Sequence, residues 1–458
     1  MVYSSTFFAL AALPFLPVHA IDLDIASTDS ITSAASTIAK GLVSYYHGTE
    51  PGHIIGVLDA PYFWWESGAM FDTMIQYWHL TGDEQYNDIV SQGLLFQQGP
   101  DGNFLPPNQT STEGNDDQST WALAAMSAAE AKLPAPQGSS WLSLAEAVFN
   151  SQGARWDTET CSGGLRWQIF TFNNGYDWKN SASNGQFFEL ASRLAYLTGN
   201  NTYSDVASRT FRWSVTTGLI DEEWKVFDGA NVEQNCSNIN KIQLSLYAAT
   251  YISGAAYMYN ITSGDDQANW RTTLNGLLNQ TISTFFVDGV ATEVACESIG
   301  TCTTDMKAMK GLLAQRLVKT IEVAPYTFQL INPLLQSTAE AAAKACSDSK
   351  CPFTWGDKGT DKGSQSGVGE QLDALSFVQA LLVKSAGNKS STTVTGAGAG
   401  NGTTSSNATD TASGTHTGSL ASGTGISSPP GDNGAMRMEG FSMGIVVAFW
   451  ISMVWLAN

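Results

Sequence analysis

The chain has 458 residues and a formal net charge of −20, and 14% of its residues are charged, against roughly 25% in an average protein. This acidic balance argues against a nucleic-acid partner, because binding to phosphates needs clustered Lys and Arg. The chain is instead rich in aromatic residues, with 14 Trp, 14 Tyr and 21 Phe, whose flat faces suit a protein core or a sugar ring.

An apolar run opens the chain and ends at Val18-His19-Ala20. Such a run predicts a secretory signal peptide over residues 1–20, although no Lys or Arg lies at its start. We therefore expect the protein to enter the secretory pathway, with a folded domain over residues 21–387.

Apolar residues at helical spacing predict a first helix over Asp29–Tyr46. After a loop with Gly, His and Pro, the aromatic stretch Pro61–Asp72 runs into a helix that ends near Leu80. The segment His79–Val90 is then echoed by Tyr196–Ala207. In each copy a helix is expected to end at Gly, and the next helix to begin three or four residues later.

Helical hairpins of this kind recur about every 55 to 70 residues, so about six or seven fit the chain. The last ones use Gly311–Lys319, Thr327–Ala345 and Glu370–Lys384. Each hairpin exposes an apolar face that only its neighbours can cover, so an all-α closed toroid of six hairpins, (α/α)6, is the expected fold. An open superhelical solenoid is the alternative.

Longer loops rich in Gly and aromatic residues recur after every second predicted helix, over residues 97–115, 161–184, 221–240 and 288–305. Loops of this length inside a compact domain are usually functional. Their spacing predicts that they gather on one rim of the toroid, around a shared cleft.

The C-terminal part changes composition after Ser385, where Ser, Thr, Gly and Ala dominate. Residues 388–433 therefore predict a disordered stalk with O-linked sugars. An apolar run over Phe441–Leu456 follows small residues and a short polar spacer, which is typical of a signal for glycosylphosphatidylinositol (GPI) attachment. Asn433 is the expected attachment residue, with Gly431 and Ser427 as rivals, and residues 434–458 are the removed propeptide. A plain C-terminal membrane anchor is the alternative.

Six cysteines in a secreted chain predict three disulfides. Their spacing favours Cys296 with Cys302 and Cys346 with Cys351, which leaves Cys161 for Cys236. None of the six has the clustered spacing of a zinc site. Asn-X-Ser/Thr sequons predict N-glycosylation at Asn108, Asn200, Asn235, Asn260, Asn279, Asn388, Asn401 and Asn407.

Two adjacent carboxylates, Asp116 and Asp117, lie where a Gly-containing loop meets a predicted helix over Trp121–Lys132. An Asp at a helix start often serves only to cap free amides. Capping needs one Asp, however, and consecutive helical residues point about 100° apart, so both cannot serve the same amides. Two close carboxylates split their pKa values and supply one acid and one anion, which is what glycoside hydrolysis requires.

Other candidate substrate-binding residues flank this pair. Trp64, Trp65, Trp167 and Trp178 could stack on sugar rings or belong to the core. The polar candidates for binding sugar hydroxyls are Gln118, Lys179, Asn180, Asn184 and Asp228. Bonds that lock a loop are the alternative for Lys179, Asn180 and Asn184, and an Asp-Gly turn is the alternative for Asp228. Glu66 and Asp72 are reserve carboxylates. The five histidines, at positions 19, 47, 53, 79 and 416, form no cluster in the sequence, and no Gly-rich phosphate loop is present, so no metal or other cofactor is expected.

Four strings in order resemble glycoside hydrolase family 76, the endo-α-1,6-mannanases, and are most similar to its fungal GPI-anchored branch. They are Trp64–Gly68, Asn115–Gln118, Gly164–Gln168 and Trp178–Gly185. The resemblance covers about Ile31 to Lys384. It implies an (α/α)6 barrel and a retaining mechanism with Asp116 as nucleophile and Asp117 as general acid/base. The residues alone do not assign these roles, but adjacent side chains meet the retaining separation of about 5–5.5 Å more easily than the inverting one.

The expected function is that of a retaining endo-α-1,6-mannosidase or transglycosidase at the fungal cell surface. The resemblance implies α-1,6-mannan or a GPI-core glycan as donor, wall glucan as a possible acceptor, attachment to the plasma membrane through the GPI anchor, and a role in cell-wall biogenesis. The alternative is a non-catalytic mannan-binding protein of the wall that uses only its aromatic residues.

Overall fold

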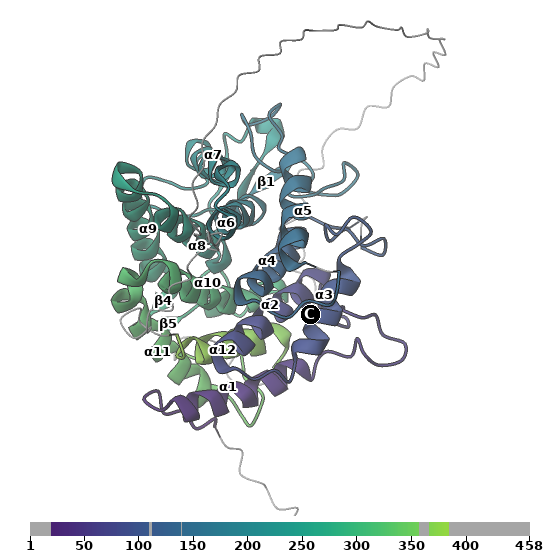
Figure 1. Ribbon diagram of the computed structural model, residues 1–458. Helices are drawn as coiled ribbons and strands as arrows, with labels where there is room; N and C mark the ends of the chain where they lie inside the picture. Colours follow the sequence, from purple (N-terminus) through teal and green to yellow (C-terminus); the bar gives the residue numbers. More distant parts are fainter. Residues whose placement is uncertain (1–19, 110–111, 139, 357–365, 384–458) are drawn as a thin grey trace, which may run out of the picture. The chain divides into compact units, whose positions relative to one another are not determined.

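The computed structural model describes residues 20–109, 112–138, 140–356 and 366–383 (Figure 1). The predicted signal peptide up to His19, the stalk and the attachment residue Asn433 lie outside these ranges, as do the sequons at Asn388, Asn401 and Asn407. The described helices include none that is both long enough and apolar enough to cross a membrane.

The described residues form twelve α-helices, which alternate along the chain between an inner and an outer position. The inner helices are α2 (Trp64–Thr81), α4 (Asn115–Ala131), α6 (Ser181–Thr198), α8 (Ser245–Ile261), α10 (Met309–Val323) and α12 (Val368–Ala380). The outer helices are α1 (Thr28–Val43), α3 (Asn87–Gln97), α5 (Trp141–Ala154), α7 (Asn201–Thr217), α9 (Gly264–Phe285) and α11 (Phe328–Ala345).

The inner helices close into a ring. Each one packs against the next inner helix along the chain, and α12 returns to pack against α2. Outside the ring, α3, α5, α7 and α9 each cover the inner helix that precedes them, while α1 and α11 both pack on α12 (Figure 1). The closed ring confirms the predicted (α/α)6 toroid and excludes the open solenoid.

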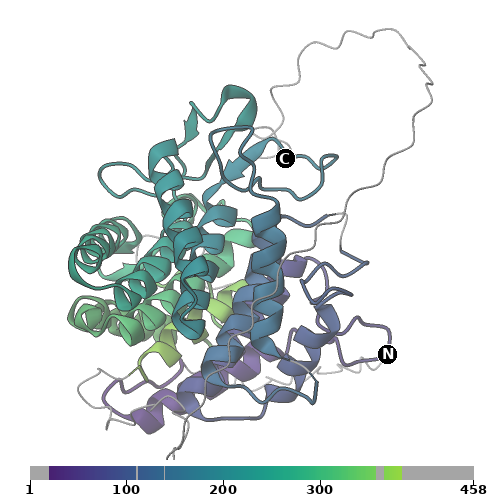
Figure 2. The same cartoon turned by 45° about the horizontal axis from the view of Figure 1, so that its top comes forward.

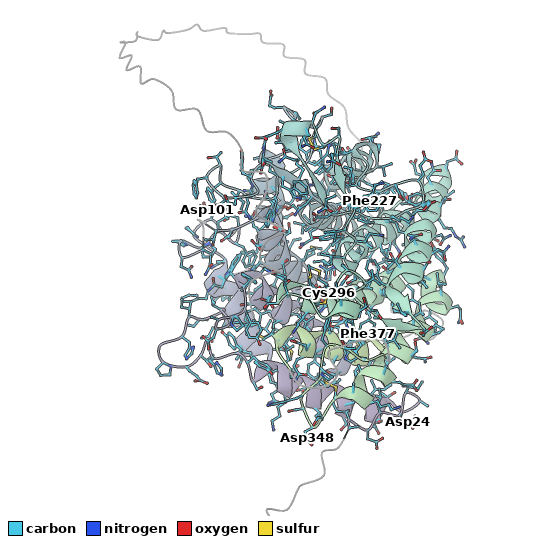
Figure 3. All side chains as sticks on the ribbon, turned by 180° about the vertical axis from the view of Figure 1, so that it is seen from behind. Asp24, Asp101, Phe227, Cys296, Asp348 and Phe377 are labelled. Atoms are coloured by element: carbon cyan, nitrogen blue, oxygen red, sulfur yellow. A yellow bond between two sulfur atoms is a disulfide. The ribbon has the colours of Figure 1, made fainter. Side chains whose placement is uncertain are left out.

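Burial follows from this arrangement. Every residue of α12 is buried, because inner helices have neighbours on all sides, whereas α1, α7 and α11 bury one stripe each. Close approach of inner helices depends on small residues: a Cβ at Gly311 of α10 would lie 2.6 Å from Leu372 of α12. In the view from behind, the exposed Asp24, Asp101 and Asp348 lie at the periphery, while Phe377 of α12 lies inside (Figure 3).

The predicted long loops contain short strands that the sequence analysis missed. Strand β1 (Trp178–Asn180) pairs antiparallel with β2 (Gly229–Asn231), which pairs with β3 (Ile239–Asn240). This small sheet lies at one end of the helices (Figure 2). A second pair joins β4 (Phe286–Val287) to β5 (Val290–Ala291).

Short 3-10 helices occupy other parts of these loops, the turn before α10 and the connection between α10 and α11. They are η1 (Val232–Gln234), η2 (Glu297–Ile299), η3 (Asp305–Ala308) and η4 (Pro325–Thr327). One loop prediction is wrong at its end: residues 181–184 already belong to α6, because Asn180 caps this helix by accepting the N–H of Ser183.

Most predicted helix positions are confirmed, with ends that differ by a few residues. The first helix ends at Val43 rather than Tyr46, and the helix predicted from Trp121 begins at Asn115. In both copies of the repeat the helix ends at the predicted glycine: α2 ends at Gly82 and α6 at Gly199, each in the left-handed conformation. The next helix, however, begins at Asn87 in the first copy and at Asn201 in the second, outside the predicted spacing.

All three predicted disulfides are confirmed. Cys161 bonds Cys236 and ties the loop before β1 to the turn after η1, while the other two bridges close short local loops. The side chains of the predicted glycosylation sites within the described ranges are all exposed, at Asn108, Asn200, Asn235, Asn260 and Asn279. N-glycosylation itself stays a prediction.

Candidate active site

The N-termini of the inner helices meet at one end of the ring, which we call the mouth. Successive inner helices run in the same direction, because each outer helix returns the chain to its starting level. Carboxylates gather there: Glu66 opens α2, Asp116 and Asp117 open α4, and Asp305 precedes α10. They are close enough to interact, since the charge of Asp305 raises the pKa of both Glu66 and Asp117.

Asp116 and Asp117 are the second and third residues of α4, and both are half-buried. Oδ2 of Asp117 accepts the N–H of Gly114 at 2.7 Å, as a helix-capping residue does. Oδ1 of Asp116 instead accepts the N–H of Asp117 at 3.1 Å, and the side-chain amide of Asn180 also bonds Asp116. The two carboxylates thus serve different donors: Asp117 accepts the N–H of the residue before the helix, whereas Asp116 accepts N–H groups of the first helical turn and the amide of Asn180.

The pKa values of both aspartates are raised. Burial raises the pKa of Asp117 to about 7, and the nearby charge of Asp305 adds to the rise. Burial and the charge of Asp117 raise the pKa of Asp116 well above its usual range, against the opposing effect of its N–H donors. Two carboxyl groups in this state hold a proton between them near neutral pH.

Gly114 allows the pair to sit against an aromatic ring. A Cβ at this position would lie closer than 3.0 Å to Oδ1 of Asp116 and 3.1 Å from Nε1 of Trp167. Trp167 is half-buried, and its backbone accepts the N–H of Asn115 at 2.7 Å. The predicted stacking residue Trp167 therefore lies beside Asp116, and only Gly fits between them.

Trp65 and Glu66 border the mouth at the start of α2. The indole of half-buried Trp65 donates to Oδ1 of Asp305 at 3.0 Å. Glu66 is buried and accepts the N–H of Phe63 at 2.7 Å, while its Oε1 has no hydrogen-bond partner among the described residues. Burial raises the pKa of Glu66 to about 8, so this carboxyl holds its proton at neutral pH.

Asp228 is linked to the aspartate pair through a residue that the sequence analysis missed. Its carboxylate accepts the amide of Asn240 at 3.0 Å and the hydroxyl of Tyr247 at 3.2 Å. Tyr247 lies on α8, and the charges of Asp228 and Asp116 both help burial to raise its pKa well above the usual range. A buried tyrosine on an inner helix gives no sequence signal that separates it from a core residue.

Four predicted contact residues are committed to other partners. Trp64 is buried, stacks on Trp121 at 4.9 Å between ring centroids and donates to Gln97. Lys179 is fully buried and donates to the carbonyls of Asp157, Thr160 and Gly163, at 3.1, 2.7 and 2.6 Å.

The two amides behave in the same way. Asn184 is buried and bonds both backbone polar atoms of Leu165. Gln118 is buried, donates to the carbonyl of Asn103 and accepts from Gln152 and Arg155. These contacts match the loop-locking alternative for Lys179 and Asn184, and they extend it to Gln118.

Glu113 is a further carboxyl, one that the sequence analysis did not single out. It is buried, and neither of its carboxylate oxygens has a hydrogen-bond partner among the described residues. Burial raises its pKa to about 9, and the charge of Asp117 adds to the rise. Glu113 therefore adds a neutral carboxyl next to the aspartate pair.

At the opposite end of the ring, carboxylates are paired with cations, and a carboxyl pKa is lowered rather than raised. Glu130, near the end of α4, pairs with Arg193 at 2.8 Å and with Lys319 at 3.2 Å, and these cations lower its pKa to about 2. Asp72, the second reserve carboxylate, is buried and lines a small interior cavity with Arg193, Arg316 and Lys319. It therefore belongs to this interior network rather than to the mouth.

The statement that the histidines form no cluster is wrong for two of them. His47 and His53 lie six positions apart in the sequence, and each contacts the carboxylate of Asp59 at 2.9 Å. The turns of the loop after α1, rather than a helical or strand periodicity, bring them together.

The comparisons with known proteins agree with the fold and identify the family. The model of glycosyl hydrolase family 76 matches residues 30–394. Mannan endo-1,6-alpha-mannosidase DFG5 of Saccharomyces cerevisiae is 39% identical to this chain over 377 residues, which are 81% of this chain and 81% of that protein.

Two solved structures are similar to the described domain. Dfg5 of Chaetomium thermophilum, crystallised with glucosamine, is 41% identical with a TM-score of 0.74, and the match covers 79% of this chain and 92% of that one. An inactive variant of the α-1,6-mannanase GH76A of Salegentibacter sp. HEL1_6, bound to α-1,6-mannotriose, has a TM-score of 0.63 at 17% identity, covering 77% and 99%. With the family model and the yeast relative, these matches lead to one conclusion: the chain belongs to glycosyl hydrolase family 76.

Proposed function

We propose that this glycoside hydrolase is a retaining endo-α-1,6-mannosidase or transglycosidase in which Asp116 and Asp117 act on the scissile bond. The observation that carries the proposal is the pair itself: two half-exposed carboxyl groups at one helix N-terminus, both with raised pKa values and with different hydrogen-bond donors. A retaining mechanism needs one ionised and one protonated carboxyl close together.

In the first step Asp116 attacks the anomeric carbon of a mannose residue, and Asp117 gives its proton to the departing glycosidic oxygen. The C–O bond breaks and a mannosyl ester forms on Asp116. Burial and the charge of Asp117 raise the pKa of Asp116, while the N–H of Asp117 and the amide of Asn180 oppose this rise by donating to its carboxylate and so stabilise the ionised form that attacks. Asp117 has one such donor, from Gly114, and its pKa of about 7 suits an acid that works near neutral pH.

In the second step the ionised Asp117 takes a proton from an acceptor, whose oxygen attacks the mannosyl ester and releases Asp116. When the acceptor is water, the result is hydrolysis, and when it is a sugar hydroxyl, the result is transfer. The proposed donor is α-1,6-mannan or a GPI-core glycan, and wall glucan is the proposed acceptor for transfer.

The proposed sugar contacts are the residues at the mouth that remain partly exposed or that bond the pair. Trp65 and Trp167 offer ring faces, while Asn180, Asp228 and Glu66 offer polar groups to hydroxyls. Trp64, Gln118, Lys179 and Asn184 support the loops behind them through the bonds described above.

Two relatives support the substrate. The yeast relative is named a mannan endo-1,6-alpha-mannosidase, and the bacterial neighbour was crystallised with α-1,6-mannotriose as a variant in which two adjacent aspartates are replaced by asparagine and which is described as inactive. An adjacent aspartate pair is also the centre of the site described above.

Trapping and product analysis test the proposal. Incubation with a 2-fluoro-mannosyl donor should add one mannosyl group to a single peptide that contains Asp116, detected by mass spectrometry. With an α-1,6-mannan oligomer and a β-glucan acceptor, new mannosyl-glucan products would show transfer, whereas reducing ends alone would show hydrolysis. A label on another carboxylate would overturn the assigned roles.

The proposed location is the outer face of the plasma membrane or the cell wall, with the domain on its Ser/Thr-rich stalk and a GPI anchor at Asn433. Release of the protein from membranes by a phosphatidylinositol-specific phospholipase C would support this anchor. Retention on the membrane after complete digestion of a control GPI protein would instead favour a C-terminal membrane anchor.

A further inference from the structure

The loop between α1 and α2, residues 44–63, is long for a compact domain and contains the only contact among the described residues in which two imidazoles share one carboxylate. Nδ1 of His47 lies 2.9 Å from Oδ2 of Asp59, and Nδ1 of His53 lies 2.9 Å from Oδ1. One ligand atom from each of the three residues falls within 4.8 Å of the other two.

We propose that His47, His53 and Asp59 form a binding site for a divalent transition-metal ion. Two imidazole nitrogens and one carboxylate make up a common ligand set for such ions, and the remaining positions are left for water. Metal–ligand bonds of about 2.1 Å would replace the two hydrogen bonds between the imidazoles and the carboxylate.

The site is built by the loop rather than by chance contact of mobile side chains. Consecutive turns join His47 to Glu50 and Glu50 to His53, with N–H to carbonyl distances of 2.7 and 3.2 Å, and they place both imidazoles on the same side. The segment before Asp59 is anchored at two points. The hydroxyl of Tyr46 accepts the N–H of Gly56 at 2.8 Å, and the hydroxyl of Ser67 on α2 accepts the N–H of Leu58 at 3.0 Å.

Charge and access also suit a cation. The three side chains are 32% to 46% exposed, so an ion can reach them from solvent. Asp59 places the one carboxylate of the ligand set between the two imidazoles. A surface cluster of two histidines hydrogen-bonded to an aspartate, without any ion, is the simpler alternative, and the two interpretations differ in metal affinity.

A bound ion would clamp the loop that leads into Phe63–Glu66 at the mouth. Because His47 follows α1 and Asp59 precedes α2, one ion would join both ends of the connection. The ion has no part in the proposed bond cleavage, which uses Asp116 and Asp117.

Titration of Ni²⁺ into the full-length protein, purified without a histidine tag and stripped with a chelator, tests the proposal. We expect one saturable site by calorimetry, weakened about tenfold or more in each of His47→Ala, His53→Ala and Asp59→Asn. His79→Ala is the matched control, because His79 pairs with a single carboxylate, that of Glu322, and its variant should bind as the wild type does.

Hydrogen exchange gives a second measurement, since amides of residues 44–63 should exchange more slowly with the ion bound. The absence of a saturable site would overturn the proposal, as would wild-type affinity for Ni²⁺ in the His47→Ala and His53→Ala variants. Binding of Mg²⁺ as tight as that of Ni²⁺ would also overturn it, because Mg²⁺ prefers oxygen ligands. Trapping on Asp116 and metal binding are separate measurements, so either result stands without the other.

Discussion

Helix α4 carries carboxylates at both ends, and the two ends behave in opposite ways. At the mouth, burial raises the pKa of Asp117 to about 7, whereas at the far end two cations lower the pKa of Glu130 to about 2. Both ends are screened from water, so burial alone does not decide the charge of a carboxyl. The difference lies in the partners: Arg193 and Lys319 neutralise Glu130, while the mouth brings more carboxyl groups and N–H donors to Asp117.

This contrast suggests different roles for the two ends of the ring. We call the end with Glu130 and its cations the structural end, and the mouth, where the reaction is proposed to occur, the chemical end. Buried ion pairs fix the packing of inner helices, but they hold each carboxylate in one protonation state. Carboxyl groups without cations destabilise the fold slightly, but they can gain and lose a proton during a reaction.

The largest expected effect tests whether the mouth is the chemical end. Replacing either carboxyl of the pair, Asp116→Asn or Asp117→Asn, should lower kcat/KM on α-1,6-mannan oligomers by about 10²–10⁴-fold or more while the melting temperature stays close to that of wild type. Kinetic assays and thermal unfolding check the two statements. Unchanged turnover in both variants would leave the pair as a structural cap and favour the non-catalytic mannan-binding alternative.

The next effect tests the structural end. Arg193→Met should lower the free energy of unfolding by about 3–5 kcal/mol, because Glu130 and Glu189 would lose a buried cation. Lys225→Ala is the control, since this lysine pairs with exposed Glu223, and it should leave the free energy of unfolding nearly unchanged. Denaturant unfolding measures both, and similar values for the two variants would remove the distinction between buried and exposed pairs.

A smaller effect on activity is expected at Gly114, where the backbone approaches the aspartate pair. Gly114→Ala should lower kcat by about 10–100-fold, because the new methyl group would displace Asp116 or Trp167. Gly153→Ala is the matched control: it lies in α5 with no atom within 4 Å of the added Cβ, so it should leave activity unchanged and stabilise the protein slightly. Equal activity of the two variants would contradict the close contact.

The pH dependence of activity should follow Asp117. Its pKa of about 7 lies above the ordinary value of 3.8, so the proposed general acid loses its proton as pH rises through about 7. The ratio kcat/KM should therefore fall on the alkaline side of about pH 7, approaching about tenfold per pH unit. A rate that rises across this range would exclude Asp117 as the acid.

The smallest effect concerns stability at the mouth. Folding raises the pKa of Glu113 from 4.5 to about 9, so the folded state holds this proton more tightly and the free energy of unfolding falls as pH rises between these values. Glu113→Gln should remove about 1 kcal/mol or more of this loss between about pH 5 and pH 9. Glu130 should act in the opposite sense, contributing stability above pH 4.5 that is lost as pH falls through about 2.

Features encoded by neighbouring residues were predictable from the sequence. The glycines that end α2 and α6, the aspartate pair at the start of α4 and the two short disulfide loops all depend on local geometry. The closed ring followed from the count of hairpins and the need to cover their apolar faces.

Features that join distant segments were not predictable. Strand β1 meets β2 across a helical hairpin, and strands of two or three residues carry too little pattern to be recognised. Lys179 and Asn184 are buried by contacts within the same loops. These contacts are not visible in the sequence, where the two residues simply lie in a segment predicted to form the site, and contact with sugar was therefore expected. Glu113, Tyr247 and the contact of His47 with His53 through Asp59 arise only when separate turns and helices come together.

The closure of the ring also constrains how the domain is made. Helix α1 leaves the ribosome first, yet it packs on α12, the last helix of the described domain, and α2 closes the ring against that same helix. During synthesis both early helices keep apolar faces uncovered until nearly the whole domain has been made. A chain truncated before residue 368 would lack α12, so α1 and α2 would keep their apolar faces exposed and cellular quality control should recognise the chain as misfolded.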